Sequence, residues 1–143
     1  MRFVLTVAVI LAVGSSPLRH QNNLASEARP EAVVQRFVDA GEAKDAAAMA
    51  ALVARDAVFA RFPSGEIIAQ SRERIQEHYS RQLRSLPPGF RITVKPRIVE
   101  GQFVIDQEHF TGIIGDRRQA TWMYLVRDGL IQRAWVLESN PTP

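Results

Sequence analysis

The chain has 143 residues, no cysteine and a formal net charge of +3 at neutral pH. A chain of this length normally forms a single domain, and the lack of cysteine excludes disulfides, thiolate metal ligands and cysteine nucleophiles. Basic and acidic residues are interspersed, as in Arg72-Glu73-Arg74, and no basic stripe carries stacking aromatic residues, which argues against a nucleic-acid-binding protein.

The N-terminus has the three-part pattern of a secretory signal peptide: a basic start, an apolar run over residues 3–13, and small residues at the end of that run. The run is shorter than the about 20 apolar residues that a membrane span needs. We therefore predict a cleaved signal peptide over residues 1–14, a secreted or periplasmic protein, and no membrane association after cleavage; an uncleaved anchor is the alternative. Residues 15–29 are polar without an apolar period, which predicts a flexible leader.

The remaining chain is predicted to form one domain over residues 30–138, followed by a tail over residues 139–143. Its first half has apolar residues at helical spacing, and Pro30 suits the first position of a helix. Asp45 and Ser71 are typical N-cap residues for two further helices. The expected elements are helices over residues 30–43, 46–54 and 72–86, with strands over residues 57–62 and 66–69 before the third helix.

The second half has the alternation and the turn residues of four consecutive strands, expected over residues 90–99, 103–113, 119–127 and 130–138. Pro96 indicates an edge strand or a bulge, because proline cannot donate to a central ladder. Asp128-Gly129 is typical of a two-residue hairpin turn. Helices followed by a strand meander predict an α+β fold, in which a strongly curved antiparallel sheet wraps around the N-terminal helices and leaves a central pocket.

This order of elements resembles the nuclear transport factor 2-like superfamily, which includes ketosteroid isomerases and SnoaL-like polyketide cyclases. The segments FARFPSGEIIAQSRERIQEHY and YLVRDGLIQRAWV carry the resemblance, which covers nearly the whole predicted domain. It implies a cone-shaped, cystatin-like fold with a central pocket. It does not imply one activity, because the superfamily includes enzymes, binding proteins and transport factors.

The catalytic groups of those relatives are missing from the matching positions. The isomerases have a general-base carboxylate where this chain has Phe62, and a catalytic tyrosine where it has Phe37. Their protonated acid falls near Trp122. The cyclase-like relatives have a histidine and an aspartate where this chain has Gln107 and Val136. The resemblance therefore predicts a pocket without the isomerase machinery, which needs a base and an oxyanion hole together.

The strand from Phe103 to Gly112 carries polar groups on both of its alternating faces. The register that the resemblance implies turns Gln107 and His109 into the pocket, along with the other odd-numbered residues. It turns Asp106 and Glu108 outward, where they are expected to form a solvated or interfacial pair. Their expected partners are arginines of neighbouring strands, namely Arg97, Arg117 or Arg133.

The predicted pocket is aromatic with a few polar points, a composition typical of small-molecule sites. His109 is the candidate acid or base and Tyr124 the candidate orienting donor, although a rim histidine and a core tyrosine are the simpler interpretations. The expected ligand-binding residues are Gln107, Trp122, Tyr79, Phe37, Phe62, Val136 and Glu138. No histidine pair has ligand spacing, so neither a metal nor a cofactor is predicted.

Three functions are compatible with these observations. The first is a binding protein for a small apolar or aromatic molecule. The second is an isomerase, cyclase or dehydratase that uses His109 as its acid and base. The third is a structural or assembly module that acts through the outer face of the sheet. That face is expected to be apolar enough to need covering, which predicts a homodimer; its expected residues are Val104, Phe110, Met123, Leu125, Trp135 and Leu137.

Overall fold

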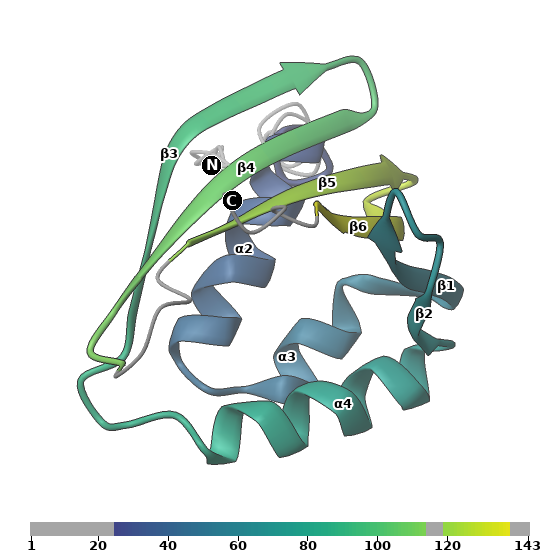
Figure 1. Cartoon of the computed structure of the whole chain (residues 1–143). Coiled ribbons are helices and arrows are strands. Elements are labelled where there is room, and N and C mark those ends of the chain that lie inside the picture. The colour runs from purple at the N-terminus through teal and green to yellow at the C-terminus, as the bar shows by residue number, and fades with distance from the viewer. Residues whose placement is uncertain (1–24, 114–118, 138–143) are drawn as a thin grey trace, which may run out of the picture.

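The computed structural model describes residues 25–113 and 119–137, which form a curved sheet with helices on its concave side (Figure 1). The helices are α2 (Pro30–Glu42), α3 (Ala46–Ala51) and α4 (Arg72–Arg84). The strands are β1 (Val53–Phe62), β2 (Ile67–Gln70), β3 (Arg91–Glu100), β4 (Phe103–Thr111), β5 (Gln119–Arg127) and β6 (Leu130–Leu137). The predicted α+β architecture is confirmed.

The six strands form one open sheet in the order β2-β1-β6-β5-β4-β3. Neighbouring strands are antiparallel except β1 and β6, which run parallel, so the sheet is mixed where the sequence alone predicts an antiparallel one. Strands β1 and β6 lie far apart along the chain, so no hairpin fixes their relative direction. Strand β3 is an edge strand whose register shifts between Val94 and Arg97, as Pro96 predicted.

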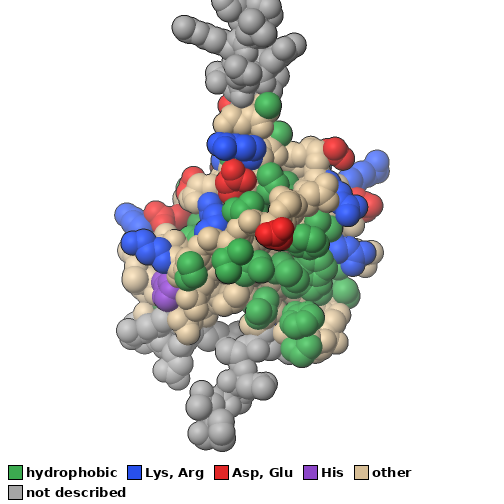
Figure 2. Space-filling view, turned by 90° about the horizontal axis from the view of Figure 1, so that it is seen from above, with side chains coloured by type: hydrophobic (Ala, Val, Ile, Leu, Met, Phe, Trp, Pro, Cys, Tyr) green, Lys and Arg blue, Asp and Glu red, His purple; other side chains and the backbone are tan. Residues whose placement is uncertain are grey.

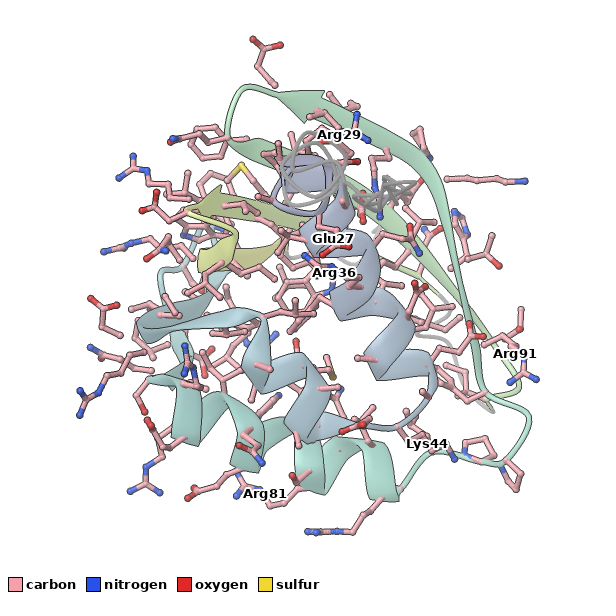
Figure 3. All side chains as sticks on the ribbon, turned by 180° about the vertical axis from the view of Figure 1, so that it is seen from behind. Glu27, Arg29, Arg36, Lys44, Arg81 and Arg91 are labelled. Atoms are coloured by element: carbon pink, nitrogen blue, oxygen red, sulfur yellow. The ribbon has the colours of Figure 1, made fainter. Side chains whose placement is uncertain are left out.

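Helix α2 runs along the concave face of the sheet and supplies one side of the core (Figure 1). Its buried residues recur at helical spacing, which is why an amphipathic helix forms there; they are Val33, Val34, Phe37, Val38 and Gly41. Beyond the helix, Lys44 Nζ donates to the carbonyl oxygens of Leu86 at 2.6 Å and Pro87 at 2.9 Å. This contact joins the turn between α2 and α3 to the chain that follows α4 (Figure 3).

Strand β1 begins earlier than the sequence indicates, because the second helix ends at Ala51 and not at Ala54. Val53 pairs with Ile131 of β6, and the Ile131 amide donates to the Leu52 carbonyl oxygen at 2.9 Å. Pairing with β6 therefore outweighs the helical preference of this alanine-rich segment.

The core lies between α2, α4 and the concave face of the sheet. Val33, Ile75, Val104 and Ile131 come from four different elements and are each fully buried. Val104 was expected on the outer face, and that prediction is wrong. Its inward direction is the first sign that β4 has the opposite parity to the one expected.

Part of the predicted domain layout lies outside the described residues, namely the signal peptide, most of the leader and the C-terminal tail, and these boundaries stay predictions. The last leader residues contact the domain: Arg36 Nη2 of α2 donates to the Glu27 carbonyl oxygen at 2.6 Å, and the two residues lie beside each other in Figure 3. No helix within the described residues is long and apolar enough to cross a membrane.

Candidate active site

The concave face of β4 carries two buried carboxyl groups. Asp106 is fully buried and Glu108 is 6% exposed. Asp106 lies opposite Trp122 of β5, and Val104 lies opposite Tyr124, so all four side chains share the inner face. The prediction that Asp106 and Glu108 face outward is therefore wrong. A shift of one residue between β4 and β5 reverses every side chain of the strand, and the polar residues on both faces left the register undecided.

Several predicted pocket residues lie on the outer face of the sheet. Gln107 and His109 occupy the outer face of β4, and His109 Nε2 lies 3.2 Å from the Lys95 carbonyl oxygen. Phe62 is 52% exposed and lies opposite Leu137, on the outer face. These three predicted positions are wrong. Glu138 lies outside the described residues.

Five aromatic rings form the interior beside the two carboxyl groups. Phe37 of α2 contacts the rings of Phe59, Tyr79 and Tyr124 at centroid distances of 5.9, 5.6 and 6.0 Å. Trp122 contacts Phe59 at 6.2 Å and stacks on Tyr124 at 6.0 Å. Phe37, Tyr79, Trp122 and Tyr124 were expected inside, and so was Val136, which lies opposite Trp122. Phe59 replaces Phe62 in this role.

Arg97 of β3 pairs with Asp106 in a two-point interaction. Its Nε and Nη2 atoms donate to the two carboxylate oxygens of Asp106, each at 2.7 Å. The remaining guanidinium nitrogen donates to Gln35 Oε1 on α2 at 2.9 Å. Burial of an isolated carboxylate would be strongly unfavourable, so the ion pair is what allows Asp106 to face the core. The hydrogen bond to Asp106 is also the main reason that the pKa of Arg97 is raised.

Glu108 has a different environment from Asp106. Its Oε1 accepts a hydrogen bond from the Tyr124 hydroxyl at 3.0 Å. Burial raises the pKa of Glu108 to about 7; the Tyr124 hydrogen bond opposes this shift, the Asp106 charge adds to it and Arg97 opposes it. The two carboxyl groups of this strand therefore have different environments. Asp106 is held in an ion pair, whereas the pKa of Glu108 lies near neutral pH, so that its acid and carboxylate forms are both populated there.

The two inner tyrosines remain hydrogen-bond donors at any ordinary pH. Burial raises the pKa of both hydroxyls above the usual range for tyrosine, and the charge of Glu108 raises both further. Tyr124 donates to Glu108. No oxygen among the described residues accepts a hydrogen bond from Tyr79. The site therefore combines a carboxyl group able to exchange a proton with a second hydroxyl able to donate to a bound molecule.

The other features that could mark a site are less specific. An open hollow of about 460 Å³ follows the outer side of α4 and is lined by charged and polar residues from Glu73 to Arg84. It contains none of the predicted pocket residues. No three acidic or histidine residues in the described part of the chain are placed to hold a metal ion.

The chain belongs to the SnoaL-like domain family, whose model matches residues 34–134. None of the curated proteins matches it. Its described fold is similar to many solved structures. A cystatin-fold protein from Novosphingobium aromaticivorans has a TM-score of 0.66 and 15% identity, over 77% of this chain and 98% of that one.

Two further structures carry names of enzymes. A candidate ketosteroid isomerase from Kribbella flavida has a TM-score of 0.59 and 22% identity, over 82% of this chain and 83% of that one. A candidate polyketide cyclase from Sinorhizobium meliloti has a TM-score of 0.61 and 19% identity, over 73% of this chain and 92% of that one. Identities this low establish a shared NTF2-like, cystatin-like fold and leave the activity to be argued from the site.

Substitutions of the buried ion pair should shift the pKa of Glu108 in opposite directions. Asp106→Asn removes a negative charge beside Glu108 and should lower its pKa, while Arg97→Met removes a positive charge and should raise it. Arg97→Met also leaves the buried Asp106 carboxylate without its partner, which should cost about 3 kcal/mol of unfolding free energy. Carboxyl carbon NMR of Glu108 and urea unfolding measure the two effects.

The matched control is Arg74→Met, which removes an exposed arginine whose Nη1 lies 2.9 Å from Glu77 Oε2 on α4. An exposed pair contributes at most about 1 kcal/mol, and this one is remote from Glu108. Equal losses of stability from the two arginine substitutions would contradict the structural role given to Arg97.

Glu108 should also make stability depend on pH. Its pKa is higher in the folded chain than in the unfolded chain, so the folded state binds the proton more tightly. The free energy of unfolding should therefore fall as pH rises from about 4.5 to about 7, by roughly 3 kcal/mol. Glu108→Gln can still accept from Tyr124 and should remove this part of the pH dependence in urea titrations at pH 5 and pH 8. An unchanged pH dependence in the variant would show that Glu108 is not the group responsible.

Proposed function

We propose that this protein binds a small apolar or aromatic molecule on the concave side of its sheet and transfers a proton to or from it, with Glu108 as the acid and base. The observation that carries the proposal is the position of Glu108. It is 6% exposed, 3.0 Å from the Tyr124 hydroxyl and beside an aromatic cluster. A carboxyl group with a pKa near the working pH is well suited to take up and return a proton.

The reaction class that fits best is proton abstraction next to a carbonyl group, as in an isomerase or cyclase. The Glu108 carboxylate would take a proton from the carbon beside the carbonyl, and the electron pair of the broken C–H bond would move to the carbonyl oxygen. The Tyr79 hydroxyl, which lies near enough for Glu108 to raise its pKa, would donate to that oxygen. Glu108 then returns the proton to the same or another carbon.

His109 is a weaker candidate for this role. It lies on the outer face of β4, and its ring contacts the Lys95 backbone instead of the aromatic cluster. A binding protein without catalysis is the second candidate function. It is favoured by the aromatic character of the concave side, since apolar walls with a few polar groups suit a small apolar ligand.

Hydrogen exchange of 2-tetralone, an apolar aromatic ketone with acidic protons next to its carbonyl, tests the proposal. The protein in deuterated buffer should accelerate exchange, followed by proton NMR, with a rate that rises with pH to a plateau above about 7. Glu108→Gln should lose about 100-fold or more of this activity, and Tyr79→Phe should lose less.

His109→Ala is the control and should leave the exchange rate unchanged. Loss of exchange in His109→Ala with retention in Glu108→Gln would reverse the assignment. Binding of 2-tetralone without any accelerated exchange would favour the binding protein.

We also propose that the outer face of the sheet joins two copies of the chain. Ile98, Ile105, Met123 and Trp135 form a row across β3, β4, β5 and β6. Ile98 is 55% exposed and Phe103 is 40% exposed. Figure 2 shows hydrophobic side chains gathered over this face. Apolar area of this extent is typical of an interface.

Light scattering at micromolar concentration should give the mass of a dimer. Phe103→Glu should give a monomer of unchanged helix content, because it places a charge in the apolar face. Gln76→Glu on the exposed side of α4 should leave the dimer intact. A wild-type monomer would refute the interface.

Export through the predicted signal peptide is likewise proposed, and N-terminal sequencing of the exported protein should show that residues 1–14 have been removed.

A further inference from the structure

Two basic side chains from different elements lie at the edge of the aromatic cluster. Arg61 follows Phe59 by two residues on β1, so both side chains point to the concave face. Arg61 lies opposite Val136 of β6, which lies opposite Trp122 of β5. Arg61 is therefore in the same row across the sheet as Trp122, and both are partly exposed.

His78 approaches the same edge from α4. Its ring meets that of the neighbouring Tyr79 at a centroid distance of 5.4 Å, and the Tyr79 ring meets that of Phe59 at 6.1 Å. Burial lowers the pKa of His78 most, and the charges of Arg81 and Arg61 lower it further. The ring contacts from His78 through Tyr79 to Phe59 place His78 of α4 beside the part of β1 that carries Arg61, although the two basic residues are distant in sequence.

The only acidic partner of Arg61 in the described part of the chain is Glu66, across the β1–β2 turn. Arg61 Nε lies 3.2 Å from Glu66 Oε2, and the Glu66 side chain is 68% exposed. An exposed pair of this kind is weak, so a bound anion can compete with Glu66 for the guanidinium group. Arginine is well suited to this task because its planar fork matches a carboxylate.

We propose that Arg61 and His78 form a subsite for the anionic group of the ligand, and that the ligands of this protein are small aromatic carboxylates. The inference rests on the proposed function, because it extends the same site to its rim. The carboxylate would lie against Arg61 and His78, and the ring system against Trp122 and Tyr79. The opposite end of the molecule would then point toward Glu108.

The dimensions of the sheet agree with this arrangement. Arg61 and Glu108 both lie near one end of the sheet, on β1 and β4, with β6 and β5 between them. Asp106 is the β4 residue in the row of Arg61, and Glu108 lies two residues further along the strand. Three strand spacings of about 4.8 Å and this two-residue offset separate the Arg61 and Glu108 backbones by roughly 16 Å. Both side chains point to the concave face and shorten this span, which leaves a length suited to a bicyclic acid and not to a long chain.

Paired titrations with 2-naphthoate and its neutral counterpart 2-naphthamide test the subsite. The two probes share a ring system and differ in the charge that Arg61 would bind. The indole NMR signal of Trp122 reports binding of either probe. We expect the wild-type protein to bind the acid roughly tenfold more tightly than the amide, because a charge-assisted pair is stronger than a neutral one. Arg61→Gln should remove this preference, because it should weaken binding of the acid and leave binding of the amide unchanged. His78→Gln should reduce the preference.

Arg74→Gln is the matched control, because Arg74 is also an exposed arginine paired with a glutamate, on the side of α4 away from the cluster. It should leave both affinities unchanged. Equal binding of acid and amide, failure of both to bind, or an unaltered preference in Arg61→Gln would overturn the subsite. Exchange of 2-tetralone, which has no carboxylate, is independent of Arg61, so a failed subsite with intact Glu108-dependent exchange leaves the proposed function standing.

Discussion

The ion pair between Arg97 and Asp106 is the interaction on which the rest of the site depends. It is the reason that a fully buried carboxylate can face the core, and it joins edge strand β3 to β4 and, through Gln35, to α2. Because side chains alternate along a strand, an inward Asp106 also turns Val104 and Glu108 inward. The position of the candidate acid and base thus follows from a pair two residues away.

The contrast between the two carboxyl groups explains how one strand can have both structural and chemical roles. Asp106 receives two hydrogen bonds from a guanidinium group, whereas Glu108 receives one from a neutral tyrosine. The first arrangement offsets the cost of burying a carboxylate with a two-point ion pair. The second leaves the cost of burial only partly offset, so that the protonated form is populated near neutral pH. Differences of this kind are found where proteins transfer protons.

The fold was predictable from the sequence because its elements have strong periodicity and clear turn residues. The amphipathic pattern of α2, the cap of α4 and the Asp128-Gly129 hairpin each agree with the structure. The inward direction of Trp122 and Tyr124 was also correct. The parity of β4 was not, because polar groups occupy both of its faces and alternation alone cannot select one. The inward direction of Trp122 selects the inner face of β4 only together with the β4–β5 register, in which Asp106 lies opposite Trp122. Arg97 was among the partners expected for the acids, but sequence could not show that the pair is buried.

Exchanging the inner and outer faces of β4 changes the chemistry expected from the whole molecule. An outward Asp106 and Glu108 would leave an aromatic binding pocket with His109 as its titratable group. The observed parity instead gives an aromatic interior with a proton-exchanging carboxyl group, and an outer face whose apolar row suits contact with another copy. The two proposed roles, proton transfer on the inner face and dimer contact on the outer face, therefore depend on the same register.

Cysteine reactivity along β4 tests this register most directly, because the natural chain has no cysteine and each single substitution gives one thiol. Glu108→Cys and His109→Cys differ by one position and, each in the monomeric Phe103→Glu variant that leaves the outer face uncovered, should differ in reaction with a soluble thiol reagent under native conditions. The account predicts slow reaction at position 108 and fast reaction at position 109, with equal rates after denaturation. Fast reaction at position 108 and protection at position 109 would contradict it.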